Sequence, residues 1–155
     1  MVGFNSEDIR NSVKSYVLIA PQEVYMQNDE EKIFYGGCHC GNVKFLFKSR
    51  SQVDIWVCNC SICCLIDYQH LFIEQAKFHL VNGQKSLNSY QFGTNTAEHL
   101  FCRRCGIKSF YRPRSHPDSI SINFRCVSVP PKIKQIIDFD GRNHEEAMKN
   151  SQHLV

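Results

Sequence analysis

The sequence of 155 residues contains no long apolar run. Its longest candidate near the start, residues 16–20, is interrupted by Pro21 and is far shorter than the roughly 18 to 20 residues that cross a bilayer. The first residues lack the apolar stretch of a secretory signal, and the last five, SQHLV, lack a prenylation cysteine. We therefore expect no membrane span and a cytoplasmic location, a nuclear location or both.

The sequence also lacks a strong excess of polar residues. Charged residues make up 21%, hydrophobic residues 43% and aromatic residues 12% of the chain, a composition that excludes a disordered protein and provides for one core. The length fits one domain. Residues 1–31 are polar and carry no cysteine, so we predict an N-terminal extension there and a single folded domain over residues 32–155.

Short runs with strand-like patterns are separated by turn signals such as Asn82-Gly83. Helical signals are confined to a turn within residues 61–67 and to residues 143–150, where Asn143 is a candidate cap and Glu145 and Glu146 favour the first turn. The pattern predicts a mainly β fold of short antiparallel sheets with a short C-terminal helix. The strands are expected at residues 43–48, which have the clearest half-buried pattern, and at 53–57, 70–74, 77–81, 88–92 and 119–123.

Nine cysteines are the most unusual feature of the composition. Disulfides are not expected to persist in a reducing compartment, and an odd number argues against a framework built only of disulfides. Metal binding explains them better. The formal charge of +3 counts the thiols as protonated, so seven thiolates around two Zn²⁺ ions bring the protein close to neutrality, and the net charge says little about partners.

Two cysteine pairs, in GCHCG at residues 37–41 and FCRRCG at residues 101–106, are each followed by glycine. A close pair on a tight turn can direct both sulfurs at one ion, and the glycine can take a positive φ that turns backbone N–H groups toward the thiolates. Four thiolates form a closed, tetrahedral zinc site of the structural kind. The alternative is four unrelated buried thiols. The predicted ligands are Cys38, Cys40, Cys102 and Cys105.

A third cluster, CNCSICC at residues 58–64, supplies Cys58, Cys60 and Cys63 from one loop. Three sulfur ligands leave a fourth position open for water or a substrate thiol, which is the arrangement of catalytic zinc. Two alternatives stay open, a closed site completed by Cys64 and a set of redox-active thiols. Because adjacent cysteines rarely reach one ion, we interpret Cys64 as a bystander and Cys126 as a core thiol.

Other candidate groups are weaker. His39, His70, His99 and His116 are interpreted as structural or exposed, although His70 follows the open site closely enough to bond a substrate or act as a base. A basic stretch, residues 103–114, contains five cations among aromatic residues and is either an anion cradle or a set of solvated positions. This stretch is not accompanied by a recognised nucleic-acid-binding motif, so it does not predict nucleic-acid binding.

The order of the motifs G-x-C-H-C-G, C-N-C-S-x-C and F-C-x-x-C-G-x-x-S-F-Y resembles the glutathione-dependent formaldehyde-activating enzyme family, and its eukaryotic centromere protein V-like branch looks closest. The resemblance covers about residues 35–150. Two departures are His144, where family members often have Trp, and an N-terminal region that is neither basic nor proline-rich as it is in the centromere protein.

The resemblance implies a zinc-binding β-tent, a structural zinc at the two pairs and a catalytic-type zinc at Cys58, Cys60 and Cys63. It also implies a carbon-sulfur lyase that joins formaldehyde to glutathione as S-(hydroxymethyl)glutathione. Two hypotheses follow. One is such an enzyme with two zinc ions per chain and a glutathione-type thiol as its substrate. The other is a non-catalytic zinc scaffold or chromatin-associated adaptor. The oligomeric state is not predicted.

Overall fold

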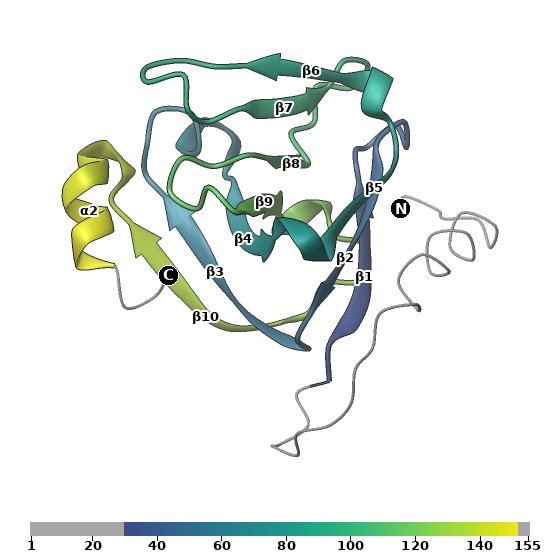
Figure 1. The fold of residues 1–155 in the computed structure, drawn as a ribbon, viewed down its shortest axis with the longest axis horizontal. Coiled ribbons are helices and arrows are strands. Elements are labelled where there is room, and N and C mark those ends of the chain that lie inside the picture. Colours follow the sequence, from purple (N-terminus) through teal and green to yellow (C-terminus); the bar gives the residue numbers. More distant parts are fainter. Residues whose placement is uncertain (1–29, 152–155) are drawn as a thin grey trace.

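A computed structural model of the chain describes residues 30–151 (Figure 1). Most of the predicted extension, residues 1–31, lies outside the described residues. Within this described part of the chain, ten strands form three sheets, and no helix is long and apolar enough to cross a membrane. The first sheet has the order β1 (Lys32–Gly37), β2 (Lys44–Ser49), β5 (Phe78–Asn82). The second has the order β10 (Lys132–Phe139), β3 (Gln52–Cys58), β4 (Gln69–Glu74), β9 (Ser119–Asn123), β8 (Phe110–Tyr111), and the third pairs β6 (Leu87–Tyr90) with β7 (His99–Cys102).

The two larger sheets lean together like the sides of a tent. In Figure 1, β2 and β3 meet at the lower end of the view and diverge upward toward β6 and β7, with β8 and β9 between them. Their inner faces share one aromatic and aliphatic core, in which Phe45 packs edge-to-face on Phe110 at 5.7 Å between ring centroids. A smaller buried cluster of Cys63, Tyr68 and Tyr111 lies apart from this core. The tent therefore holds two packed regions, and each contains predicted metal ligands, Cys38 and Cys102 in the larger one and Cys63 in the smaller one.

The mainly β prediction is confirmed, and all six expected strands are present within one or two residues of their predicted ends. One expected pattern is wrong. In β2, the consecutive residues Phe45, Leu46 and Phe47 are all buried, so this strand is covered on both faces and is not half-buried. Phe45 and Phe47 belong to the larger core, whereas Leu46 points to the opposite face of the sheet and is nevertheless 1% exposed.

Strand β10 departs from the predicted antiparallel arrangement because it runs parallel to β3 along its whole length. It lies at the edge of the five-stranded sheet, and only Phe139 of its eight residues is buried. Its last residue, Phe139, pairs with Cys58. The register therefore brings the segment after β10 directly to the loop that carries the second cysteine cluster.

The predicted helical segments are present as the 3₁₀ turn η1 (Cys64–Ile66) and as α2 (His144–Asn150), with Glu145 and Glu146 in its first turn. Asn143 occupies the N-cap position, but its side chain makes no capping hydrogen bond. Its Nδ2 instead donates to Asp140 Oδ2 at 2.7 Å, so the predicted capping role is wrong. Asn143 instead helps to close the turn that connects β10 to α2.

Candidate metal centres and the adjoining cavity

The two Gly-terminated pairs come together as the sequence predicts. Cys38 and Cys40 lie in the turn between β1 and β2, whereas Cys102 ends β7 and Cys105 lies in the turn that follows. The four Sγ atoms lie within 4.8 Å of one another, and two of the separations, Cys38–Cys40 and Cys40–Cys102, are 3.6 Å. Such spacing matches the edges of a tetrahedron of thiolates around one ion with Zn–S bonds of about 2.3 Å.

Both turns have the glycine conformation that this geometry requires. Gly41 and Gly106 have φ of +77° and +73°, and neither is crowded by its neighbours. Val43 N donates to Cys38 Sγ at 3.3 Å, a hydrogen bond that stabilises a thiolate. The donor set therefore fits a closed zinc site that joins the start of the tent to its third sheet.

The second cluster lies at the end of β3. Cys58 is its last residue, Cys60 and Cys63 follow in the loop, and Cys63 is buried. Contacts with Cys58 and Cys63 lower the pKa of Cys60, while contacts with Cys58 and Cys60, followed by burial, raise the pKa of Cys63. Three neighbouring thiols cannot all ionise easily, because their negative charges would repel one another. A divalent cation between them removes this obstacle and lets all three bind as thiolates.

A histidine that could serve as a nitrogen ligand lies beside these sulfurs. Cys58, Cys63 and His70 place their ligand atoms within 4.8 Å of one another, whereas Cys60, the third predicted ligand, does not belong to this group. His70 is 3% exposed, its Nδ1 lies 3.0 Å from Ser121 Oγ, and its Nε2 is buried without a hydrogen-bond partner among the described residues. Burial first, and then the charge of Lys108, lower its pKa to about 3, so the ring is neutral and able to bind metal.

His70 therefore joins the candidate ligands, beyond its predicted role as a base or substrate contact. The spacing of residues along the sequence does not indicate this placement, because it depends on strand register. In the β3–β4 pair, His70 lies opposite Trp56, two residues before Cys58, so the hairpin itself delivers the imidazole to the cysteine loop. Cys64 is exposed and donates to Ser61 O, and half-buried Cys126 has its pKa raised to about 11 by burial. Neither belongs to a metal-binding group.

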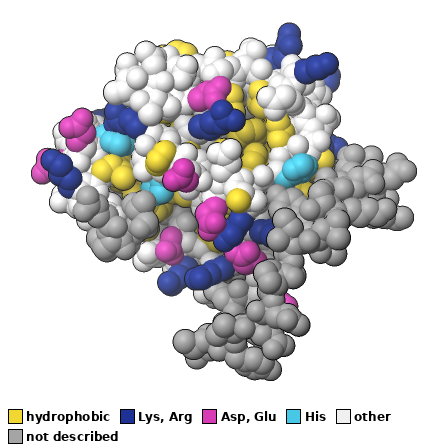
Figure 2. All heavy atoms as spheres, in the orientation of Figure 1, with side chains coloured by type: hydrophobic (Ala, Val, Ile, Leu, Met, Phe, Trp, Pro, Cys, Tyr) yellow, Lys and Arg dark blue, Asp and Glu magenta, His cyan; other side chains and the backbone are white. Residues whose placement is uncertain are grey.

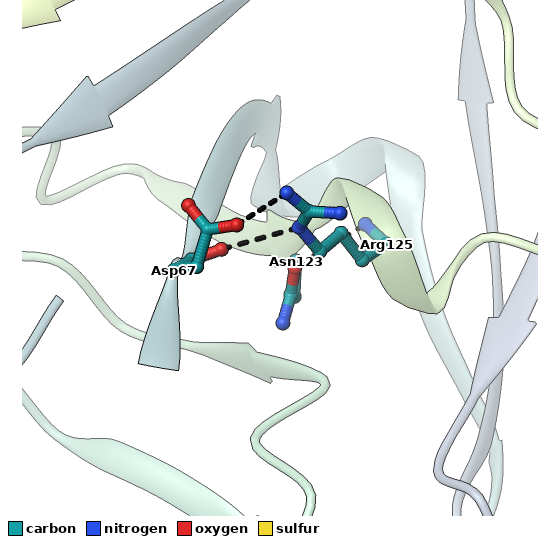
Figure 3. A network of polar contacts seen from close by, with 3 residues as sticks. All are labelled: Asp67, Asn123 and Arg125. Carbon is teal, nitrogen blue, oxygen red and sulfur yellow. Dashed lines mark hydrogen bonds and ion pairs between the residues drawn. The ribbon is translucent and has the colours of Figure 1, made fainter. Parts of the chain in front are cut away.

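Polar contacts hold the cysteine loop from two sides. Asn59 Nδ2 donates to Asp140 Oδ1 at 2.8 Å, and Arg142 donates through its backbone N to Asn59 Oδ1 at 3.1 Å. On the other side, Asp67 has a positive φ of 46° and forms an ion pair with Arg125, whose Nε also donates to Asp67 O (Figure 3). The contacts between Asp67 and Arg125 thereby join the turn before β4 to the turn after β9.

A cavity of about 400 Å³ opens onto the second cluster. Its walls are mainly apolar and include several aromatic rings, with the cysteine loop on one side and the segment after β10 on another. His116 stacks on Phe72 at 3.9 Å between centroids, and Trp56 packs edge-to-face against both. The lining residues include Trp56, Phe72, Phe92, Tyr111 and Phe139, the three cysteines, the histidines His70, His99 and His144, and the arginines Arg114 and Arg142, the second of which donates from Nε to Asn59 O.

The predicted basic stretch does not form one cradle. Arg103 donates to Lys85 O, Arg112 pairs with Glu98, and Lys108 is buried, so only Arg114 of the five cations lines the cavity. On the face shown in Figure 2, Lys and Arg side chains alternate with Asp and Glu instead of gathering in a patch. The second cation at the cavity, Arg142, comes from the segment after β10.

Comparison with known proteins agrees with this architecture. A crystal structure of a Rhodobacter sphaeroides protein superposes with a TM-score of 0.57 at 30% sequence identity, over 66% of this chain and 98% of that one. The model of the glutathione-dependent formaldehyde-activating enzyme family matches residues 33–139, which span both cysteine groups. Neither comparison tests the centromere protein V-like branch, which stays a prediction. The chain belongs to the glutathione-dependent formaldehyde-activating enzyme family.

Proposed function

We propose that the protein is a zinc-dependent carbon-sulfur lyase that forms and cleaves the hydroxymethyl adduct of a glutathione-type thiol. The observation that carries the proposal is the cavity itself, because it places three cysteine sulfurs in a space large enough for a small organic molecule. A purely structural metal has no need of such access, and the closed group at Cys38, Cys40, Cys102 and Cys105 shows how this chain builds a site of that kind.

Cys58, Cys60 and Cys63 would hold the zinc, with His70 as a further donor. The ion would supply Lewis acidity, which lowers the pKa of a thiol or polarises a carbonyl. The protein contributes the surroundings. The aromatic walls exclude water from a reactive aldehyde, and Arg114 and Arg142 offer charge to the carboxylates of the thiol.

The second candidate is a non-catalytic zinc scaffold or adaptor, in which the second ion only orders the loop. The contacts of Asn59 and Asp67 favour it to the extent that they already fix that loop from two sides. The accessible cavity favours the enzyme. A cytoplasmic or nuclear location remains a prediction under either candidate.

Metal content and thiol binding test the proposal. Wild-type protein is expected to contain two zinc equivalents and to bind glutathione in a calorimetric titration, whereas Cys60→Ser is expected to contain one and to bind none, because the thiol needs the second ion. Cys64→Ser, which changes an exposed sulfur outside both groups, is the matched control and should behave as wild type. The lyase proposal is wrong if glutathione binds neither protein and adduct forms only at the spontaneous rate.

A separate prediction concerns the carboxylates of the thiol. Replacing Arg114 with Gln is expected to weaken glutathione binding about tenfold, equivalent to the loss of one charge-assisted hydrogen bond. Arg104→Gln, an exposed arginine of the same stretch that does not line the cavity, is the control. The dissociation constants of both variants, compared at two salt concentrations, show whether the effect belongs to this cavity or to overall charge.

A further inference from the structure

Lys108 is a buried cation beside the second cluster that the function proposed above leaves unused. It is 7% exposed, and its Nζ lies 4.0 Å from the centroid of the Tyr111 ring and 4.8 Å from that of Tyr68. These two rings pack with Cys63 in the smaller buried cluster. Among the described residues, no carboxylate pairs with Lys108. The thiolates are its neighbouring negative charges, and they act to raise its pKa.

The closest polar contact of Lys108 is an imidazole. Its Nζ lies 2.6 Å from Nδ1 of His99. Burial lowers the pKa of Lys108, but its Nζ lies over the faces of the Tyr111 and Tyr68 rings, an environment that favours the ammonium form. An ammonium can only donate hydrogen bonds, so Nδ1 of His99 must accept one from Lys108. The single proton of the neutral imidazole must then lie on Nε2. Burial, followed by the charge of Lys108, lowers the pKa of His99 to about 4 and keeps that ring neutral.

His99 is also held rigidly where a substrate would bind. It is 5% exposed, and its ring is stacked on Tyr111 at 4.9 Å and on Phe92 at 5.3 Å between centroids. All three residues line the cavity together with Cys58, Cys60 and Cys63. A neutral imidazole with a fixed tautomer and a fixed plane is a preorganised hydrogen-bond donor, which is what the developing charge on a carbonyl oxygen requires.

We propose that His99 donates its Nε2–H to the aldehyde-derived oxygen of the substrate, and that Lys108 is the positioning residue that fixes this tautomer. The inference rests on the proposed lyase activity. In the synthetic direction, the thiolate sulfur bonds to the carbonyl carbon, and the C=O π pair moves to the oxygen. The Nε2–H of His99 donates a hydrogen bond to this oxygen as its negative charge develops. The oxygen then takes from solvent the equivalent of the proton that the thiol released. Cleavage runs through the same steps in reverse.

The tautomer is tested directly by ¹⁵N NMR of the imidazoles in the zinc-loaded protein. The proposal expects a protonated Nε2 and an unprotonated, hydrogen-bonded Nδ1 for His99, and a change of this signature in Lys108→Met. Lys132→Met, on the exposed edge strand β10, should leave the His99 signals unchanged. A proton found on Nδ1 in the wild-type protein overturns the proposal, and this measurement does not depend on whether Lys108→Met folds.

The catalytic role is tested by exchange kinetics of formaldehyde and glutathione. His99→Phe is expected to lower kcat about 100- to 1,000-fold, the usual cost of one such donor, while the dissociation constant for glutathione stays near the wild-type value. His99→Gln, whose amide can still donate, should recover part of the rate, and Lys108→Met should lose about tenfold. Wild-type kcat in His99→Phe overturns this inference alone. Wild-type protein that fails to exceed the spontaneous rate overturns the proposed function and this inference with it.

Discussion

Cys102→Ser is expected to abolish the cooperative folding of the whole domain. Cys102 is 1% exposed and lies at the junction of β7 with the closed group of four sulfurs. Structural zinc contributes about 10–16 kcal/mol of binding free energy in small domains, which is comparable to the entire free energy of unfolding of about 5–15 kcal/mol. A buried serine hydroxyl in place of a thiolate ligand also leaves a polar group without a metal partner.

Circular dichroism during heating is the measurement, with Cys60→Ser and Cys64→Ser beside it. Cys60→Ser should keep a cooperative transition, since the first group and the larger core remain intact, and Cys64→Ser should melt as wild type. Chelator added to the wild-type protein should reproduce the Cys102→Ser result, because removal of the ion and removal of its ligand act on the same site. Equal losses in Cys102→Ser and Cys60→Ser would contradict the assignment of separate structural and catalytic roles.

The closed group could be predicted because its information is local. Two short pairs with a glycine after each specify two tight turns, and Gly41 and Gly106 take the positive φ that those turns need. The pairing of the turns across more than sixty residues follows from the ligand count, since each pair is incomplete alone. No knowledge of the sheets was needed for this step.

The surroundings of the second cluster could not be predicted in the same way, because they depend on strand register. His70 reaches the cysteines through the β3–β4 pairing, and His99 and Lys108 meet through a 2.6 Å contact between residues on β7 and the loop before β8. Residues 103–114 carry five cations and no acidic residue in sequence, yet the fold turns Lys108 inward and Arg112 toward Glu98. Composition gives the number of charges, whereas topology decides which of them share a cavity.

The parallel strand β10 shows a further reason for missed structure. Seven of its eight residues are at least partly exposed, so apolar and polar side chains follow no strict alternation that would mark a strand. Its importance lies in what it carries. By pairing with β3 up to Cys58, it delivers the turn around Gly141 to the metal loop, and this contact has no signal in the spacing of the cysteines.

Gly141→Ala is expected to remove the second metal while leaving the first in place. A Cβ at position 141 would lie 2.9 Å from Cys60 Cβ and closer still to Cys58 Sγ, so either the ligand or the turn must move. The turn is not free to move, because Asn59 bonds both Asp140 and Arg142 on either side of the glycine. Displaced ligands and their supporting contacts typically cost about 10- to 100-fold in metal affinity.

The zinc content of Gly141→Ala should therefore fall from two equivalents to one after mild chelation, without loss of the cooperative melting transition. Glu145→Ala, an exposed change four residues further along in α2, is the control for general disturbance of the C-terminal segment and should retain both ions. Two chelator-resistant equivalents in Gly141→Ala would show that this turn does not restrict the cysteine loop. If Gly141→Ala retains one zinc equivalent and loses glutathione binding as Cys60→Ser does, the turn after β10 is part of the second metal centre. The substitution supports this conclusion because it replaces none of the candidate ligands.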